Sequence, residues 1–77
     1  MNQKILEMLE ELRPEFDFNN SENFILDGLL DSFDIIMLTS MIEEQYDINI
    51  DGLDIVPENF VSIQSIELLI KKTEIKK

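Results

Sequence analysis

The segment DGLLDSFDIIML, residues 27–38, places Ser32 directly behind an aspartate and at the start of a long apolar run. Asp31 and Ser32 have side chains that favour helix starts, so the pair predicts the beginning of an α-helix. The first turn of a helix leaves backbone N–H groups unpaired and carries the positive end of the helix dipole, which favours an attached phosphate. Ser32 is therefore a candidate attachment site, and its plainer interpretation is a side chain that only caps the helix.

A second candidate for chemistry is the acidic segment DINIDGLDIVPE, residues 47–58. It satisfies the EF-hand calcium pattern with ligand-type residues and a glycine at the required positions, namely Asp47, Asn49, Asp51, Gly52 and Glu58. Against a calcium site, Ile48 and Ile50 have the character of packing residues. Asp54 also stands where an apolar residue normally pairs neighbouring loops, and the segment that starts at Asp17 is a poor second loop because it lacks the glycine and the final acid.

The chain contains neither cysteine nor histidine. This excludes disulfides, zinc sites built from sulfur or imidazole, and every mechanism that needs a histidine base. Carboxylate pairs remain, but a small helical chain offers little room for a water-excluding cleft, so we expect no enzyme and no catalytic residues. With 17 acidic and 6 basic side chains, the net charge of −11 would repel nucleic acids and anionic membranes and attract proteins with basic patches.

The longest apolar run, residues 35–38, is far shorter than the roughly 20 residues that cross a bilayer. Met1 is followed by a charged amphipathic segment and not by the pattern of a signal peptide. At 44% hydrophobic residues, the chain is apolar enough to fold despite its charge. We therefore expect a soluble, cytoplasmic, monomeric protein with one domain over residues 1–77 and no membrane span.

Four helical pieces would position these residues. The first spans 2–13, with apolar side chains at helical spacing, and the central one spans 32–46. Pro57 suits the first position of a short helical turn, and Ser62 can cap a last helix that ends near Lys72. No strand is convincing. The sequence thus predicts an all-α, small four-helix bundle with a long loop between helices 1 and 2 and a short third helix.

The long loop, residues 14–31, is unusually apolar for a connection. Solvated loops do not carry so many large apolar side chains, so this one must pack across the helices. Its apolar residues are Phe16, Phe18, Phe24, Ile25, Leu26, Leu29 and Leu30.

The central helix has two apolar sectors when its residues are placed at about 100° intervals. The core sector contains Ile35, Leu38, Ile42 and Tyr46. The opposite sector contains Phe33, Ile36, Met37, Ser40 and Glu44. Either the long loop covers this second sector, or the sector is an exposed patch for a partner. Glu43, Glu44 and Asp47 would give the patch a negative rim, which suits basic partners.

The stretch DGLLDSFDIIMLTSMIEEQYDI, residues 27–48, resembles the phosphopantetheine attachment region of acyl carrier proteins. In that family, the serine of an Asp-Ser-Leu-like motif starts the second helix and holds a 4′-phosphopantetheine arm. The order of helices, the chain length and the acidity extend the resemblance over most of the chain, and it implies an acyl-carrier-protein-like fold. The motif reads DSF behind GLL, and Met37 stands where fatty-acid carriers often have an acid. Both features are more similar to D-alanyl carriers and discrete secondary-metabolism carriers.

The resemblance implies that Ser32 is the modification site for covalent 4′-phosphopantetheine and that Asp31 is its motif partner. It implies a partner-recognition face made of Phe33, Ile36, Met37, Ser40, Glu43 and Glu44. The implied partners are a phosphopantetheinyl transferase, an acyl- or aminoacyl-activating ligase and downstream acyl-transfer enzymes of fatty-acid or secondary-metabolite biosynthesis. Two alternatives stay open: a calcium-binding protein that uses residues 47–58, and an adaptor bundle without a prosthetic group.

Overall fold

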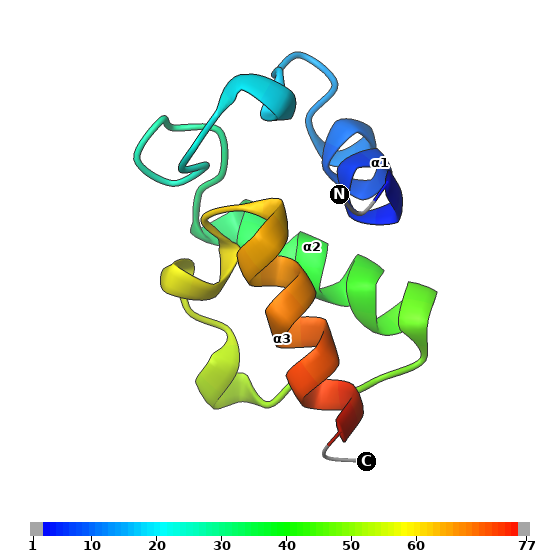
Figure 1. The fold of residues 1–77 in the computed structure, drawn as a ribbon. Coiled ribbons are helices and arrows are strands. Elements are labelled where there is room, and N and C mark those ends of the chain that lie inside the picture. Colours follow the sequence, from blue (N-terminus) through cyan, green and yellow to red (C-terminus); the bar gives the residue numbers. More distant parts are fainter. Residues whose placement is uncertain (1–2, 76–77) are drawn as a thin grey trace.

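The structure is a computed structural model that describes residues 3–75, and every regular element within that range is helical (Figure 1). Its α-helices are α1 (Gln3–Leu12), α2 (Ser32–Tyr46) and α3 (Ile63–Ile75). Single turns of 3₁₀ helix lie in the connections: η1 (Phe18–Asn20), η2 (Gly52–Asp54) and η3 (Pro57–Phe60). The helix α1 contacts α2 and α3, and the turn η3 also contacts α2 and α3. The hydrophobic core therefore lies between these four elements.

The predicted four-helix count is not confirmed in the described range. Where a short third helix was expected, the sequence PENF forms only the 3₁₀ turn η3. Pro57 opens this turn, and Ser62 already caps α3, so the intervening residues are too few for repeated α-helical hydrogen bonds. The all-helical class predicted from the sequence is confirmed for residues 3–75.

The helix α1 is amphipathic, as its spacing predicts, and turns one side to the core. The predicted start at residue 2 lies outside the described residues. Arg13 follows the last helical residue, and its N–H still donates to the Leu9 carbonyl at 2.9 Å before Pro14 ends the hydrogen-bond ladder. The buried side chains of α1 are Ile5, Leu6, Met8 and Leu9.

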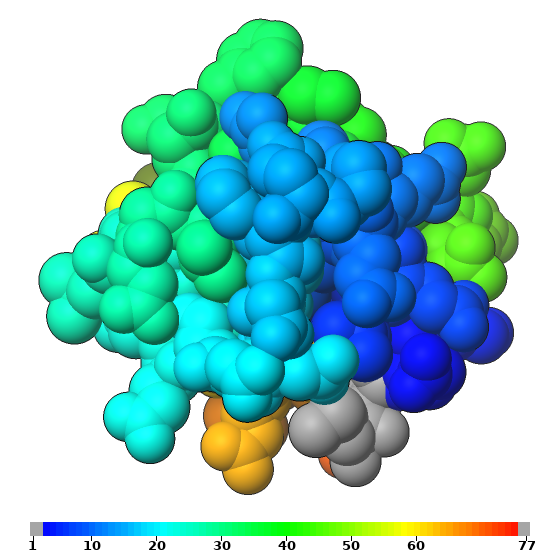
Figure 2. Space-filling view, turned by 90° about the horizontal axis from the view of Figure 1, so that it is seen from above, coloured from blue at the N-terminus to red at the C-terminus, as the bar shows by residue number. Residues whose placement is uncertain are grey.

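The long loop packs over the core, as its composition predicts. The Phe18 ring meets the Phe24 ring edge-on at 5.2 Å between centroids, and both side chains are buried. Gly28 adopts a left-handed φ of 76°, which lets the chain reverse so that the Leu29 and Leu30 N–H groups donate to the Phe24 carbonyl at 2.8 and 3.2 Å. Leu26 is the exception, with 84% of its surface exposed. Viewed from above, this loop and α1 together cover one side of the molecule (Figure 2).

The long loop is also fastened to the far end of the chain. The Phe24 N–H donates to the Val61 carbonyl at 2.7 Å, directly before α3 begins. Ser62 caps α3 as predicted, because its Oγ accepts the Ser65 N–H at 3.1 Å and the Ser65 Oγ accepts the Ser62 N–H at 3.1 Å. The helix continues to Ile75, past the end predicted near Lys72.

Candidate functional site

The start of α2 is closed by two aspartates that cap each other. Asp31 is the N-cap residue, and its Oδ1 accepts the Asp34 N–H at 2.9 Å. In return, Asp34 Oδ2 accepts the Asp31 N–H at 3.2 Å, which completes a capping box. Ser32 is thus the first helical residue and does not supply the cap. Its interpretation as the capping side chain is wrong, because Asp31 takes that role.

Ser32 is exposed, and so are its neighbours Asp31 and Phe33. Its hydroxyl donates and accepts no hydrogen bond among the side chains and backbone groups that the structure describes between residues 3 and 75. The Ser32 side chain is therefore a primary alcohol on a rigid helix end, presented to solvent and not used by the fold.

The charge on Asp31 is stabilised by its surroundings. The hydrogen bond from the Asp34 N–H is the largest cause that lowers the pKa of Asp31 below its ordinary value, and the positive charge of Arg13 lowers it further. A carboxylate at the N-terminal end of a helix also meets the positive end of the helix dipole. Asp31 is consequently an anion beside Ser32 at neutral pH.

A partly buried ion pair joins this helix start to the end of α1. Arg13 Nε lies 3.0 Å from Asp34 Oδ1, and the Asp34 side chain is only 4% exposed. The hydrogen bond to Asp34 raises the pKa of Arg13 above its ordinary value, so the guanidinium stays charged. Sequence reasoning missed this pair, because its members are 21 positions apart. The sequence shows a lone arginine at a helix end and the Asp-x-x-Asp spacing of a capping box, but neither pattern indicates that the two sites pair with each other.

The second apolar sector of α2 is exposed. Phe33 is 67% exposed, Ile36 60% and Met37 41%, so the long loop does not cover them and the exposed alternative is confirmed. Ser40 and Glu44 are exposed on the same helix. Their role in recognising a partner stays a prediction.

Glu43 differs from the other residues predicted for this face. It is half-buried, and its Oε2 accepts the Ile50 N–H at 2.9 Å. The Glu43 carboxylate therefore holds the connection after α2 in place, which is a structural task that the sequence did not indicate.

Residues 47–58 bury the two isoleucines that were predicted to pack, Ile48 and Ile50. Asp51 Oδ1 accepts the Leu53 N–H at 2.9 Å, and Asp54 Oδ1 lies 3.0 Å from Lys72 Nζ. Over residues 3–75, no three acidic side chains come together in an arrangement that could hold a metal ion.

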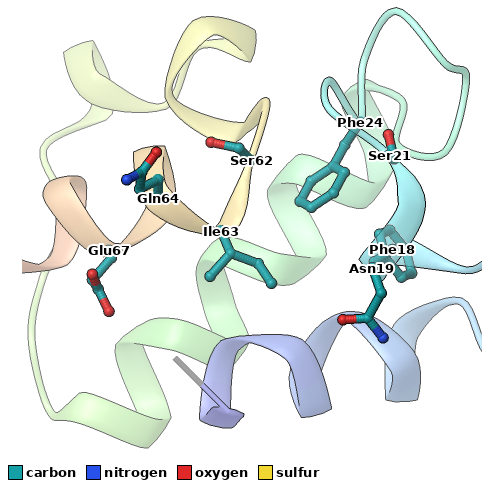
Figure 3. A pocket seen from close by; sticks show the side chains of 8 residues that line it. All are labelled: Phe18, Asn19, Ser21, Phe24, Ser62, Ile63, Gln64 and Glu67. Carbon is teal, nitrogen blue, oxygen red and sulfur yellow. The ribbon is translucent and has the colours of Figure 1, made fainter. Parts of the chain in front are cut away.

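A hollow of about 390 Å³ lies between the long loop and the start of α3 (Figure 3). The Phe24 ring and the Ile63 side chain line it from these two segments, and Glu67 lies farther along α3 (Figure 3). Sequence reasoning did not find this hollow, because its walls come from segments that are distant in the chain.

The start of α2 can act as an attachment point, since it combines an exposed hydroxyl, a fixed helix end and an adjacent apolar surface. Comparisons with protein-family models, curated proteins and solved structures find no match to this chain. Among the helices that the structure describes, none has the length and apolar character needed to cross a membrane.

Proposed function

We propose that this protein is an acyl carrier protein whose Ser32 bears a covalent 4′-phosphopantetheine arm. One observation carries the proposal: Asp31 caps α2, so the exposed Ser32 hydroxyl at the first helical position serves no purpose in the fold. The motif around it, DGLLDSF, resembles the attachment motif of carrier proteins. A serine that is exposed and unbonded at this position fits a group attached through oxygen.

The attachment step would use Ser32 as the nucleophile. Ser32 Oγ forms a bond to the phosphorus of coenzyme A that bears the pantetheine, and the anhydride bond to the other phosphate breaks. Adenosine 3′,5′-bisphosphate leaves with the electron pair, and the hydroxyl proton passes to a base supplied by the transferase. The product is a phosphodiester at the N-terminal end of α2, where the unpaired N–H groups and the helix dipole favour its negative charge.

When attached, the arm supplies a terminal thiol on which acyl or aminoacyl groups are held as thioesters, so the chain needs no cysteine of its own. The role of this chain is to present the arm on a rigid helix end. The exposed side chains of Phe33, Ile36 and Met37 follow Ser32 on α2 and offer an apolar contact to partner enzymes. Glu44 and the net charge of −11 favour partners with basic surfaces.

The proposed fold is the carrier-protein bundle, with η3 in the place of the short third helix. The proposed partners are a phosphopantetheinyl transferase, an acyl- or aminoacyl-activating ligase and acyl-transfer enzymes that use the loaded carrier. We propose further that the protein acts as a monomer in the cytoplasm. The DSF motif and Met37 support the D-alanyl or secondary-metabolism type of carrier over the fatty-acid type.

The test is co-expression with a broad-specificity phosphopantetheinyl transferase, followed by mass spectrometry of the intact protein. The wild type should gain the mass of one phosphopantetheine, and Ser32→Ala should gain none. Ser40→Ala is the matched control for the attachment site, because Ser40 is also an exposed serine of α2. Although Ser40 lies on the predicted recognition face, its variant keeps the Ser32 hydroxyl, so at the end of the reaction it should still carry the added mass. A wild type that stays unmodified, while the same transferase modifies a known carrier, would refute the proposal.

A further inference from the structure

Asp34 links three elements at the point where α2 begins. One of its carboxylate oxygens accepts from Arg13 at the end of α1, at 3.0 Å. The other accepts the N–H of Asp31, the last residue of the long loop, at 3.2 Å. Because Ser32 lies between Asp31 and Asp34, its backbone is held within this network from both sides.

We propose that Arg13 and Asp34 form a latch that positions Ser32 for phosphopantetheine transfer. The proposal rests on the proposed function and adds a positioning residue, Arg13, that does not itself touch the transferred group. The latch docks the first turn of α2 against the end of α1, so the backbone that carries the Ser32 hydroxyl keeps one position. A nucleophile carried on a fixed backbone reacts faster than one on a mobile turn, because less conformational freedom is lost on the way to the transition state.

The latch also balances charge at the attachment point. Asp31 and Asp34 place two carboxylates within one turn of Ser32, and the incoming phosphoryl group brings further negative charge. Arg13 pairs directly with Asp34, and its charge also reaches Asp31. Without the guanidinium, the phosphoryl group would approach an unpaired Asp34 carboxylate, and Asp31 would keep only its hydrogen bonds and the helix dipole.

The latch can be tested by steady-state kinetics of the transferase, with the carrier as the varied substrate. Arg13→Gln and Asp34→Asn each break the ion pair and should lower kcat roughly ten- to a hundredfold with little change in KM. A variant that is merely less folded would supply less usable carrier, which raises the apparent KM and leaves kcat unchanged. The split between kcat and KM therefore separates a positioning role from a structural one.

The double variant Arg13→Gln/Asp34→Asn provides a rescue. The asparagine carbonyl can accept the Asp31 N–H while its amide donates to the glutamine, so the two elements are joined again without charge. We expect the kcat of the double variant to lie within about threefold of the wild-type value, so its loss should be smaller than that of either single variant.

If Arg13→Gln does not fold, Arg13→Lys replaces it. This variant keeps the charge but loses the guanidinium fork, so kcat should fall while the melting temperature is largely kept.

Lys72→Gln is the matched control, because it breaks a different ion pair between elements, the one with Asp54, which involves no residue of the α2 start. It should leave kcat unchanged. Folded single variants with the kcat of the wild type would overturn the latch, and so would losses confined to KM. A wild type that is not modified at all would refute the proposed function, which is a different outcome.

Discussion

Ile36 and Ile42 lie on the same helix and face opposite environments: Ile36 is 60% exposed, and Ile42 is completely buried. The two side chains have the same size and chemistry. Their replacement by alanine therefore compares a solvent-facing side of α2 directly with its core side.

Ile42→Ala should destabilise the protein by about 2–5 kcal/mol, because it leaves a cavity in the core. Ile36→Ala should change the free energy of unfolding by no more than about 0.5 kcal/mol. Denaturant unfolding of both variants measures the difference.

Ile36→Ala should also slow loading by a partner ligase, since exposed apolar anchors carry much of the binding energy at interfaces. Ligase turnover with Ile36→Ala equal to that of the wild type would contradict the recognition role of this face.

A second prediction concerns the acid side of the stability profile. The pKa of Asp31 is lower in the folded chain than its unfolded value of about 3.9, so its contribution to stability is complete above that value. The contribution is lost as the pH falls through the folded pKa. Asp31→Asn keeps an N-cap acceptor but cannot titrate, so between about pH 6 and about pH 3 its melting temperature should fall less than that of the wild type. If the melting temperatures of the wild type and Asp31→Asn fall equally over that pH range, Asp31 makes no such contribution.

A third prediction separates the carrier from the calcium alternative. A true EF-hand sensor loop at residues 47–58 would bind calcium at roughly micromolar concentrations or tighter, and Glu58→Gln would abolish the binding. We expect weak binding, roughly millimolar, that magnesium can replace and that depends little on Glu58. The reason is that, over residues 3–75, no three acidic side chains come together to hold a metal ion, and that Asp51 Oδ1 already accepts the Leu53 N–H. Calorimetry would decide, and tight calcium-selective binding would favour the alternative.

The long loop supplies a fourth prediction. Phe24→Ala should destabilise the protein by about 3–5 kcal/mol, because the Phe24 ring is buried against Phe18. Leu26→Ala is the control within the same loop, and it should cost no more than about 0.5 kcal/mol because Leu26 is exposed. Thermal or denaturant unfolding measures both. Equal losses would mean that the loop does not pack in solution as it does in the structure.

The parts of the fold that follow from local patterns were predictable. The bounds of α2 agree with the prediction of 32–46, because the Asp31-Ser32 start and the apolar spacing are both encoded within one helix. The packing of the long loop followed from its phenylalanines. The angular position of Phe33, Ile36 and Met37 predicted that they face away from the core sector of α2, but the sequence left open whether the long loop covers them.

The parts that depend on distant contacts were not predictable. Nothing near Arg13 in the sequence indicates Asp34 as its partner, and nothing near Phe24 indicates the hydrogen bond to Val61. Glu43 is a further example. Nothing in the sequence indicates that the carboxylate of this helix residue accepts a hydrogen bond from the backbone N–H of Ile50. The length of the expected third helix was overestimated, because a proline such as Pro57 is equally typical of the start of one 3₁₀ turn and of a longer helix.

The cap supplied by Asp31 has an evolutionary consequence. Since neither the capping box nor the core uses the Ser32 hydroxyl, many residues at position 32 would leave the fold intact, and alanine would even suit the helix better. Selection for folding alone would let this position drift. If related chains keep a serine at position 32, this would indicate selection for the hydroxyl itself. Asp31 and Asp34, in contrast, would be kept because the fold needs them.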